Sequence, residues 1–217
     1  RAYTILSTNG NLVEDKDGKL QGVDITTGMS FAYRGADDAT GAVKYVTMAT
    51  DGKLYVEGGT LEVQGSIAQN ADGTGIGGIV ELDENTGLSV NGDINVTKLD
   101  IDGAVTVKNY TSDDGEVTPG ITTVDKKFSV GTSGSFETVC TTKLNEGGTV
   151  YGKATFAELV LGNGKTLYVG NDKHNGHATI GKLTSGTVTF DPDFDPETKT
   201  IAIEKATTGA VKAAAAE

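Results

Sequence analysis

The chain has 217 residues, of which 31 are glycine and only 3 are proline, and its formal net charge is -12. Glycine has no three-residue period and Val, Ile and Leu recur regularly, so a collagen triple helix and a disordered chain are excluded. The acidic balance makes nucleic acid and anionic membrane surfaces poor partners, and no apolar run is long enough for insertion into a bilayer.

One kind of turn recurs along the chain and ends each time in an apolar residue. The pattern Asp-Gly-Lys-Leu stands at residues 17–20 and 51–54, and weaker forms follow. The apolar residues that end these turns are Leu20, Leu54, Leu88, Phe128, Leu167 and Ile201. Their spacing of 34–40 residues predicts about six copies of one unit. We expect the four middle anchors, Leu54 to Leu167, to be buried as a stacked ladder.

Short alternating stretches surround each turn. Apolar residues at every second position, bounded by Gly, Asn and Asp, are typical of half-buried strands joined by tight turns. The clearest stretches, in chain order, are 45–48, 54–56, 61–63, 79–82, 88–90, 94–96, 121–124, 128–130, 136–139, 159–161, 167–169, 178–180, 188–190 and 201–203. Helix signals are nearly absent, because the Ala-rich segment 211–217 is too short to form a stable helix alone.

The pattern therefore predicts an all-β fold, for which two architectures remain open. In a β-solenoid, similar to a parallel β-helix, about six repeats of 34–40 residues stack side chains on equivalent side chains of the next coil. In a β-sandwich, antiparallel hairpins form two packed sheets. The even period favours the solenoid, whereas the tight turn at Asn163 and Gly164 favours a hairpin.

The fit to the repeat divides the chain into three parts. Residues 1–44 fit least and are predicted to form an N-terminal cap or assembly segment. Residues 45–197 are predicted to form the repeat-built β domain. Residues 198–217 are predicted to contribute a C-terminal strand and a flexible tail, which is a second possible assembly segment.

An acidic loop near the C-terminus is the best metal candidate in the sequence. Asp191, Asp193, Asp195 and Glu197 alternate with other residues, so an extended backbone would project the four carboxylates to one side. Ca²⁺ binds oxygen ligands in irregular loops, which makes calcium the possible cofactor. The alternative is a solvated connection shaped by two prolines.

The other reactive side chains favour no catalytic function. His174 and His177 lie in a polar loop without the further ligands that Zn²⁺ requires, and Cys140 is expected to be a buried structural thiol. The glycine-rich run 73–78 lacks the lysine of a nucleotide-binding loop and is better explained as a tight corner or surface loop. We therefore expect a protein that is not an enzyme.

The repeats resemble those of bacterial surface proteins. Residues 51–58, 86–96 and 98–107 carry the pattern, and the resemblance covers roughly residues 45–190. It is to repeat-built adhesins and autotransporter passenger domains, S-layer subunits and fibre subunits such as phage tail fibres. The resemblance implies an extracellular, cell-surface protein with a structural or adhesive role. We expect a secreted chain whose signal peptide has been removed.

The first functional hypothesis is self-assembly into a filament or surface array, with copies of the chain itself as the partner. The expected contacts are terminal strands that add to a neighbour's sheet edge. They comprise Ala2, Tyr3, Thr4, Ile5 and Leu6 at one end and Thr200, Ile201, Ala202 and Ile203 at the other.

Two other functions remain open. One is an adhesin module, monomeric or trimeric, that binds a glycan or host protein through loops such as 110–119 and 170–177. The other is a polysaccharide-degrading β-helix enzyme. Such an enzyme is disfavoured because its groove would combine Asp with Arg or Lys, and the only arginines are Arg1 and Arg34.

Overall fold

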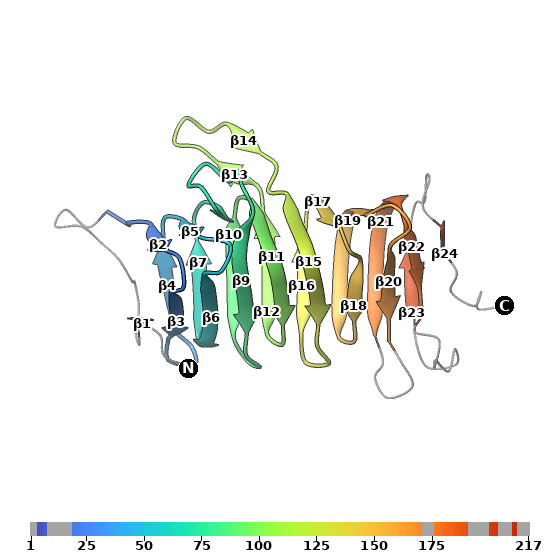
Figure 1. Ribbon diagram of the computed structural model, residues 1–217, viewed down its shortest axis with the longest axis horizontal. Coiled ribbons are helices and arrows are strands. Elements are labelled where there is room, and N and C mark those ends of the chain that lie inside the picture. The colour runs from blue at the N-terminus through green and yellow to red at the C-terminus, as the bar shows by residue number, and fades with distance from the viewer. Residues whose placement is uncertain (1–3, 8–18, 171–175, 191–199, 204–209, 212–217) are drawn as a thin grey trace.

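The computed structural model of the chain describes residues 4–7, 19–170, 176–190, 200–203 and 210–211. Their strands form one 22-stranded sheet and one separate two-stranded hairpin. The large sheet is parallel and curls about 321° round an axis, which is consistent with a β-helix-like solenoid. Strands follow one another in chain order along the long axis of the molecule (Figure 1). The all-β prediction is confirmed.

Three faces of parallel strands make up the large sheet, and one passage of the chain through faces A, B and C is called a coil here. Face A contains β2 (Val23–Ile25), β5 (Val46–Met48), β8 (Ile67–Ala68), the first parts of β11 (Ile94–Ile101) and β15 (Thr122–Val130), β17 (Thr141–Leu144), and the last parts of β19 (Lys153–Leu161) and β21 (His177–Ser185).

Face B follows face A in each coil and extends furthest toward both ends. It contains β1 (Thr4–Ser7), β3 (Ser30–Arg34), β6 (Lys53–Gly58), β9 (Gly77–Leu82), the last parts of β11 and β15, β18 (Gly148–Val150), β20 (Thr166–Val169), β22 (Thr187–Thr189) and β24 (Ala210–Val211).

Face C completes the coil before the chain returns to face A. It contains β4 (Thr40–Val43), β7 (Thr60–Val63), β10 (Gly87–Asn91), β12 (Ala104–Lys108), β16 (Ser135–Thr138), the first parts of β19 and β21, and β23 (Thr200–Ile203). The antiparallel hairpin pairs β13 (Tyr110–Thr111) with β14 (Val117–Thr118).

The strand pairing corrects the predicted repeat. Residues that pair across neighbouring coils are 17 to 31 residues apart in the sequence, as in Leu88 with Val105 and Val105 with Phe136. Leu54 pairs with Val80 on face B, whereas Leu88 pairs with Leu61 on face C. The four middle anchors, Leu54, Leu88, Phe128 and Leu167, are buried as predicted. They do not form one ladder, so the period of 34–40 residues is not the structural repeat.

The antiparallel sandwich is also wrong for the large sheet, because all of its described pairings are parallel. The turn at Asn163 and Gly164 joins β19 to β20, which pair with other strands rather than with each other. It is therefore a corner between faces A and B. Gly164 has φ of 69° there, which explains why a glycine follows an asparagine.

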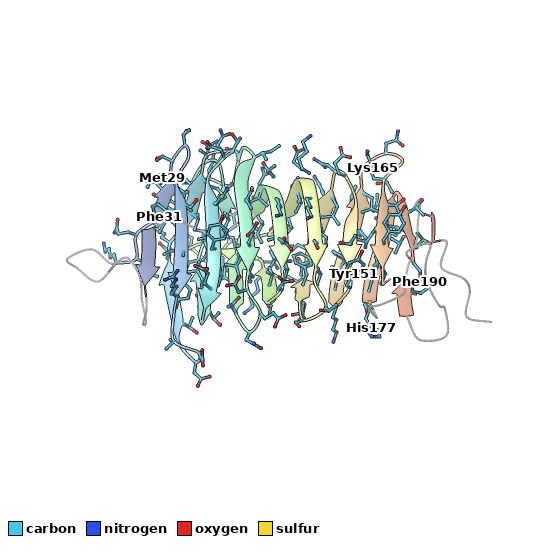
Figure 2. The ribbon with its side chains drawn as sticks, turned by 60° about the horizontal axis from the view of Figure 1, so that its bottom comes forward. Met29, Phe31, Tyr151, Lys165, His177 and Phe190 are labelled. Carbon is cyan, nitrogen blue, oxygen red and sulfur yellow. The ribbon has the colours of Figure 1, made fainter. Side chains whose placement is uncertain are left out.

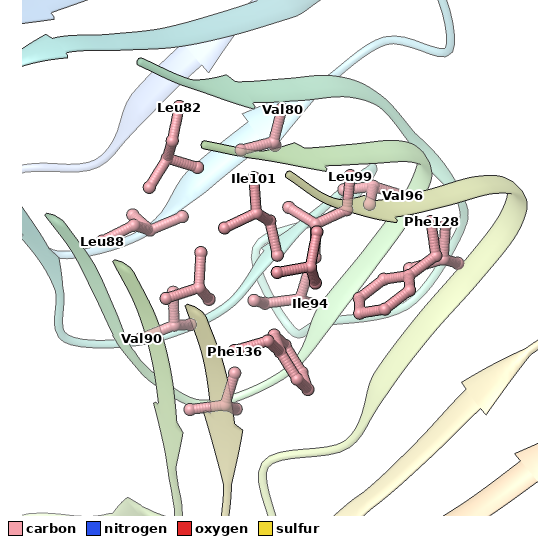
Figure 3. Close-up of a cluster of buried hydrophobic side chains, with 14 of the residues drawn as sticks. Val80, Leu82, Leu88, Val90, Ile94, Val96, Leu99, Ile101, Phe128 and Phe136 are labelled. Atoms are coloured by element: carbon pink, nitrogen blue, oxygen red, sulfur yellow. The ribbon is translucent and has the colours of Figure 1, made fainter. Parts of the chain in front are cut away.

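The interior is filled by the inward side of each strand. In β10, Leu88 and Val90 are buried while Gly87, Ser89 and Asn91 are partly exposed, and β7 shows the same alternation. Figure 3 shows Val80, Leu82 and Ile101 of face B pointing toward Leu88 and Val90 of face C. The core is thus a continuous apolar column, which no single coil could form alone.

An aromatic cluster enlarges this column at mid-length. Phe128 meets Phe136 edge-on with ring centroids 5.3 Å apart, and the Phe136 and Phe156 centroids are 5.6 Å apart. Each ring is 1% exposed.

Among the described residues, no helix is long and apolar enough to cross a membrane.

Candidate functional site

The corner between face C and the next face A is built for close stacking of coils. A Cβ added to Gly92 would lie 2.8 Å from the carbonyl oxygen of Gly65, and one added to Gly120 would lie 2.6 Å from the carbonyl oxygen of Gly92. Only glycine fits such a contact without a shift of backbone. At this corner the chain therefore passes closely over the coil before it.

Two insertions leave the stack near this corner. Between Asn109 and Gly120 the chain forms the hairpin β13–β14 before returning to face A, and between β8 and β9 it forms the loop 69–76. The hairpin extends outward beside β9 to β11 (Figure 1). Ile94 of the next coil pairs with Ile67 and Val96 pairs with Gly77, so the next coil has only Asn95 where this coil has residues 68–76. The stack does not require either insertion.

A pocket of about 600 Å³ lies where the two insertions meet the corner. The successive turns of the corner contribute Lys44, Tyr45, Gln64, Ser66 and Asn91. The loop contributes Ala71 and Asp72, and the hairpin contributes Asn109, Tyr110, Thr111 and Asp113. Residues far apart in the sequence thus line one pocket. Its size is in the range of ligand-binding clefts.

Hydrogen bonds hold the corner beneath the pocket. Asp93 accepts a hydrogen bond from the Ile121 amide at Oδ1, at 2.8 Å, and its own amide donates to Ser66 Oγ at 2.9 Å. Asp93 therefore joins three successive corner turns. Burial raises the pKa of the Asp93 carboxyl, and the hydrogen bond from Ile121 opposes that shift only in part.

Side chains within each insertion fix its shape. In the loop, the Thr74 hydroxyl and amide both donate to Asp72 Oδ1, at 2.6 and 3.0 Å, and these bonds lower the pKa of Asp72. In the hairpin, the amide of Glu116 donates to Ser112 Oγ at 3.1 Å. Asp72 therefore presents a charged carboxylate to the pocket at neutral pH.

Tyrosine rings provide the apolar surface of the pocket. Tyr45 packs over the backbone of Gly22, since a Cβ on Gly22 would lie 2.0 Å from the ring. Tyr110 is 41% exposed on the hairpin. One ring is thus held against the stack, and the other is carried by the insertion.

A second group of charged residues lies at the corner between faces B and C. Asp102 follows β11, and Asp83 and Glu84 follow β9 at the corresponding turn of the previous coil. Asp102 is exposed, but partial desolvation by its surroundings raises the pKa of its carboxyl, with further contributions from the negative charges of Asp100, Glu84, Asp83 and Glu81. Lys98 lies 3.0 Å from Glu81 and 3.4 Å from Asp100, so it compensates this charge only in part.

We predict that Asp102→Asn stabilises the chain at pH 7. A carboxyl whose pKa is raised on folding contributes stability below its unfolded pKa of about 3.9 and loses that contribution as the pH rises through its folded pKa. The ionised Asp102 is therefore unfavourable at pH 7. Thermal melts should show a higher midpoint for the variant at pH 7 and no gain at about pH 3. Glu137→Gln is the control, and an equal gain in both variants would contradict the prediction.

The predicted metal and assembly residues lie partly outside the described residues. Asp191, Asp193, Asp195 and Glu197 lie outside them, as do Ala2 and Tyr3. Thr4, Ile5 and Leu6 belong to β1, and Thr200, Ile201, Ala202 and Ile203 form β23. Within the described part of the chain, no group of three or more His, Cys, Asp or Glu side chains is placed to hold a metal ion.

Cys140 and the two loop predictions have different outcomes. Cys140 is half-buried rather than buried, and its thiol donates to Asn109 Oδ1 at 2.6 Å, beside the hairpin. The segment 110–119, expected to be a binding loop, is the hairpin that lines the pocket. Of the segment 170–177, residues 171–175 lie outside the described residues.

No protein-family model, curated protein or solved structure matches this chain.

Proposed function

We propose that the chain is a non-enzymatic extracellular structural protein that assembles end to end into a filament or surface array. The supporting observation is the state of the two ends of the parallel sheet. Among the described strands, β2 pairs only with β5 on face A, while β23 pairs only with β21 and β24 only with β22. Each end can therefore accept a further parallel strand.

The polarity of the stack determines the form of such an assembly. All pairings in the large sheet are parallel, so its two ends differ and a contact between copies would be head to tail. Met29, which is 36% exposed, and the partly buried Phe31 lie toward the N-terminal end (Figure 2). The exposed apolar side chain of Met29 favours burial of this end against a second copy.

Electron microscopy and size-exclusion chromatography of the purified chain, in calcium and in EDTA, test the assembly. We expect filaments or sheets that form without any added ligand. If EDTA dissolves them, calcium is the cofactor and Asp191, Asp193, Asp195 and Glu197 are its expected ligands. A small monodisperse particle under both conditions would contradict the assembly.

A second candidate function is an adhesin-type binding module for a glycan or a host protein. The convergence of two insertions on one pocket favours it, because insertions in repeat structures often form the binding face. Both functions are compatible in one molecule. An assembled stack would display the pocket many times and thereby increase avidity for a surface that carries many copies of the ligand.

A further inference from the structure

The pocket between the 69–76 loop and the hairpin carries the side chains that sugar recognition requires. Carboxylates and side-chain amides accept and donate several hydrogen bonds each, which suits the adjacent hydroxyls of a pyranose. Glu62, Asp72 and Asp113 supply carboxylates, and Gln64 and Asn91 supply amides. These groups can form hydrogen bonds with several sugar hydroxyls at once.

The two tyrosines add a surface for the carbon skeleton of a sugar. Tyr45 and Tyr110 both line the pocket and come from different coils. An aromatic ring presents a flat, electron-rich face with a polar tip, so it packs against C–H groups while its hydroxyl forms a hydrogen bond. A pocket of about 600 Å³ accommodates one or two sugar rings.

The charge of the lining selects among sugars. Three carboxylates and one ammonium group, that of Lys44, line the pocket, and the whole chain carries a net charge of -12. An anionic ligand would therefore be repelled both locally and at long range. Phosphorylated, sulfated and acidic sugars are disfavoured on this ground.

We propose that this pocket binds a neutral saccharide, with Asp72 receiving its hydroxyls and Tyr110 packing on its ring. This inference rests on the second proposed function, a binding module, and names its ligand class and its site. Tyr45 and Ser66 hold one wall on the rigid stack, while the hairpin carries the opposite contacts. Sequence positions from 44 to 113 contribute to this one site.

Saturation-transfer NMR on the full chain tests the proposal with methyl mannoside, methyl galactoside and N-acetylglucosamine as neutral probes, and glucuronic acid as the anionic probe. We expect transfer to at least one neutral probe and none to glucuronic acid. Titration of the same probe with Asp72→Asn and with Tyr110→Ala should show affinity about tenfold weaker for each. Asp51→Asn and Tyr168→Ala, which do not line the pocket, serve as matched controls.

The outcomes separate the site from the function. Unchanged far-UV circular dichroism of each variant shows that a loss of affinity is not a loss of folding. If a neutral sugar binds but the pocket variants bind it as well as the controls do, the pocket assignment is overturned while the binding module stands. If glucuronic acid binds best, the ligand class is overturned. If a broad glycan and protein array shows no ligand, both the inference and the second function are overturned.

Discussion

Phe136→Ala is expected to lower the free energy of unfolding by about 3–5 kcal/mol, the range for removal of a buried aromatic side chain. The ring is 1% exposed and contacts both other members of the aromatic cluster, Phe128 at 5.3 Å and Phe156 at 5.6 Å between centroids. Truncation would remove these contacts and leave a cavity between three coils.

The stack limits the relaxation that could fill this cavity. Phe136 pairs with Val105 on one side and Ala154 on the other, and backbone hydrogen bonds between parallel strands fix the spacing of these residues. Urea denaturation should show a lower midpoint with an unchanged slope. Phe136→Leu should cost less than Phe136→Ala because it leaves a smaller cavity, and Val139→Ala, at a side chain 59% exposed, should be nearly neutral. A loss below about 1 kcal/mol for Phe136→Ala would contradict a rigid core.

The strands and their inward side chains could be predicted from the sequence, because alternation with period two is a local signal. Leu88 and Val90 are buried and Ser89 is partly exposed, as their alternation predicts. The length of a coil could not be predicted in the same way. All three faces use the same alternating pattern, so a motif on face B, at Leu54, resembles one on face C, at Leu88.

The corners also differ in length from coil to coil, which makes the structural repeat harder to recognise in the sequence. The passage from Ile67 to Gly77 takes residues 68–76 in one coil, and the equivalent passage from Ile94 to Val96 takes Asn95 alone in the next. A loop can lengthen at small entropic cost, so selection for stacking does not fix the length of a corner. The spacing of 34–40 residues therefore arises from motifs on different faces rather than from one ladder.

The candidate site was predictable only in part. The segment 110–119 interrupts the alternating pattern, which marks it as a loop able to carry function. The 69–76 loop, Tyr45 and Ser66 have no local signal that joins them to it. They meet the hairpin because the coils stack in a particular register, and that register depends on the lengths of all the corners between them.

Gly78→Ala is expected to destabilise the chain by about 3 kcal/mol, at the upper end of the usual cost of overpacking. Gly78 lies in β9, and a Cβ there would lie 2.0 Å from the carbonyl oxygen of Gly52 in the previous coil. That same oxygen accepts a hydrogen bond from the Ile79 amide at 2.9 Å. The added methyl group would therefore separate the two coils and break a bond of the ladder, because its neighbour is backbone and cannot rotate away.

Gly164 provides the matched control, because its Cβ would meet nothing within 4 Å and only its φ of 69° opposes substitution. Gly164→Ala should cost about 1 kcal/mol, and Gly164→Asn less, since asparagine tolerates the left-handed conformation. Gly78→Asn should destabilise the chain at least as much as Gly78→Ala, because a steric clash with the Gly52 backbone opposes any side chain at this position. Hydrogen exchange provides the local measurement, with faster exchange of the Ile79 amide expected in Gly78→Ala but not in Gly164→Ala. If Gly78→Ala were as stable as the wild type, the prediction would be contradicted. The backbones of Gly78 and Gly52 would then be far enough apart to admit a methyl group.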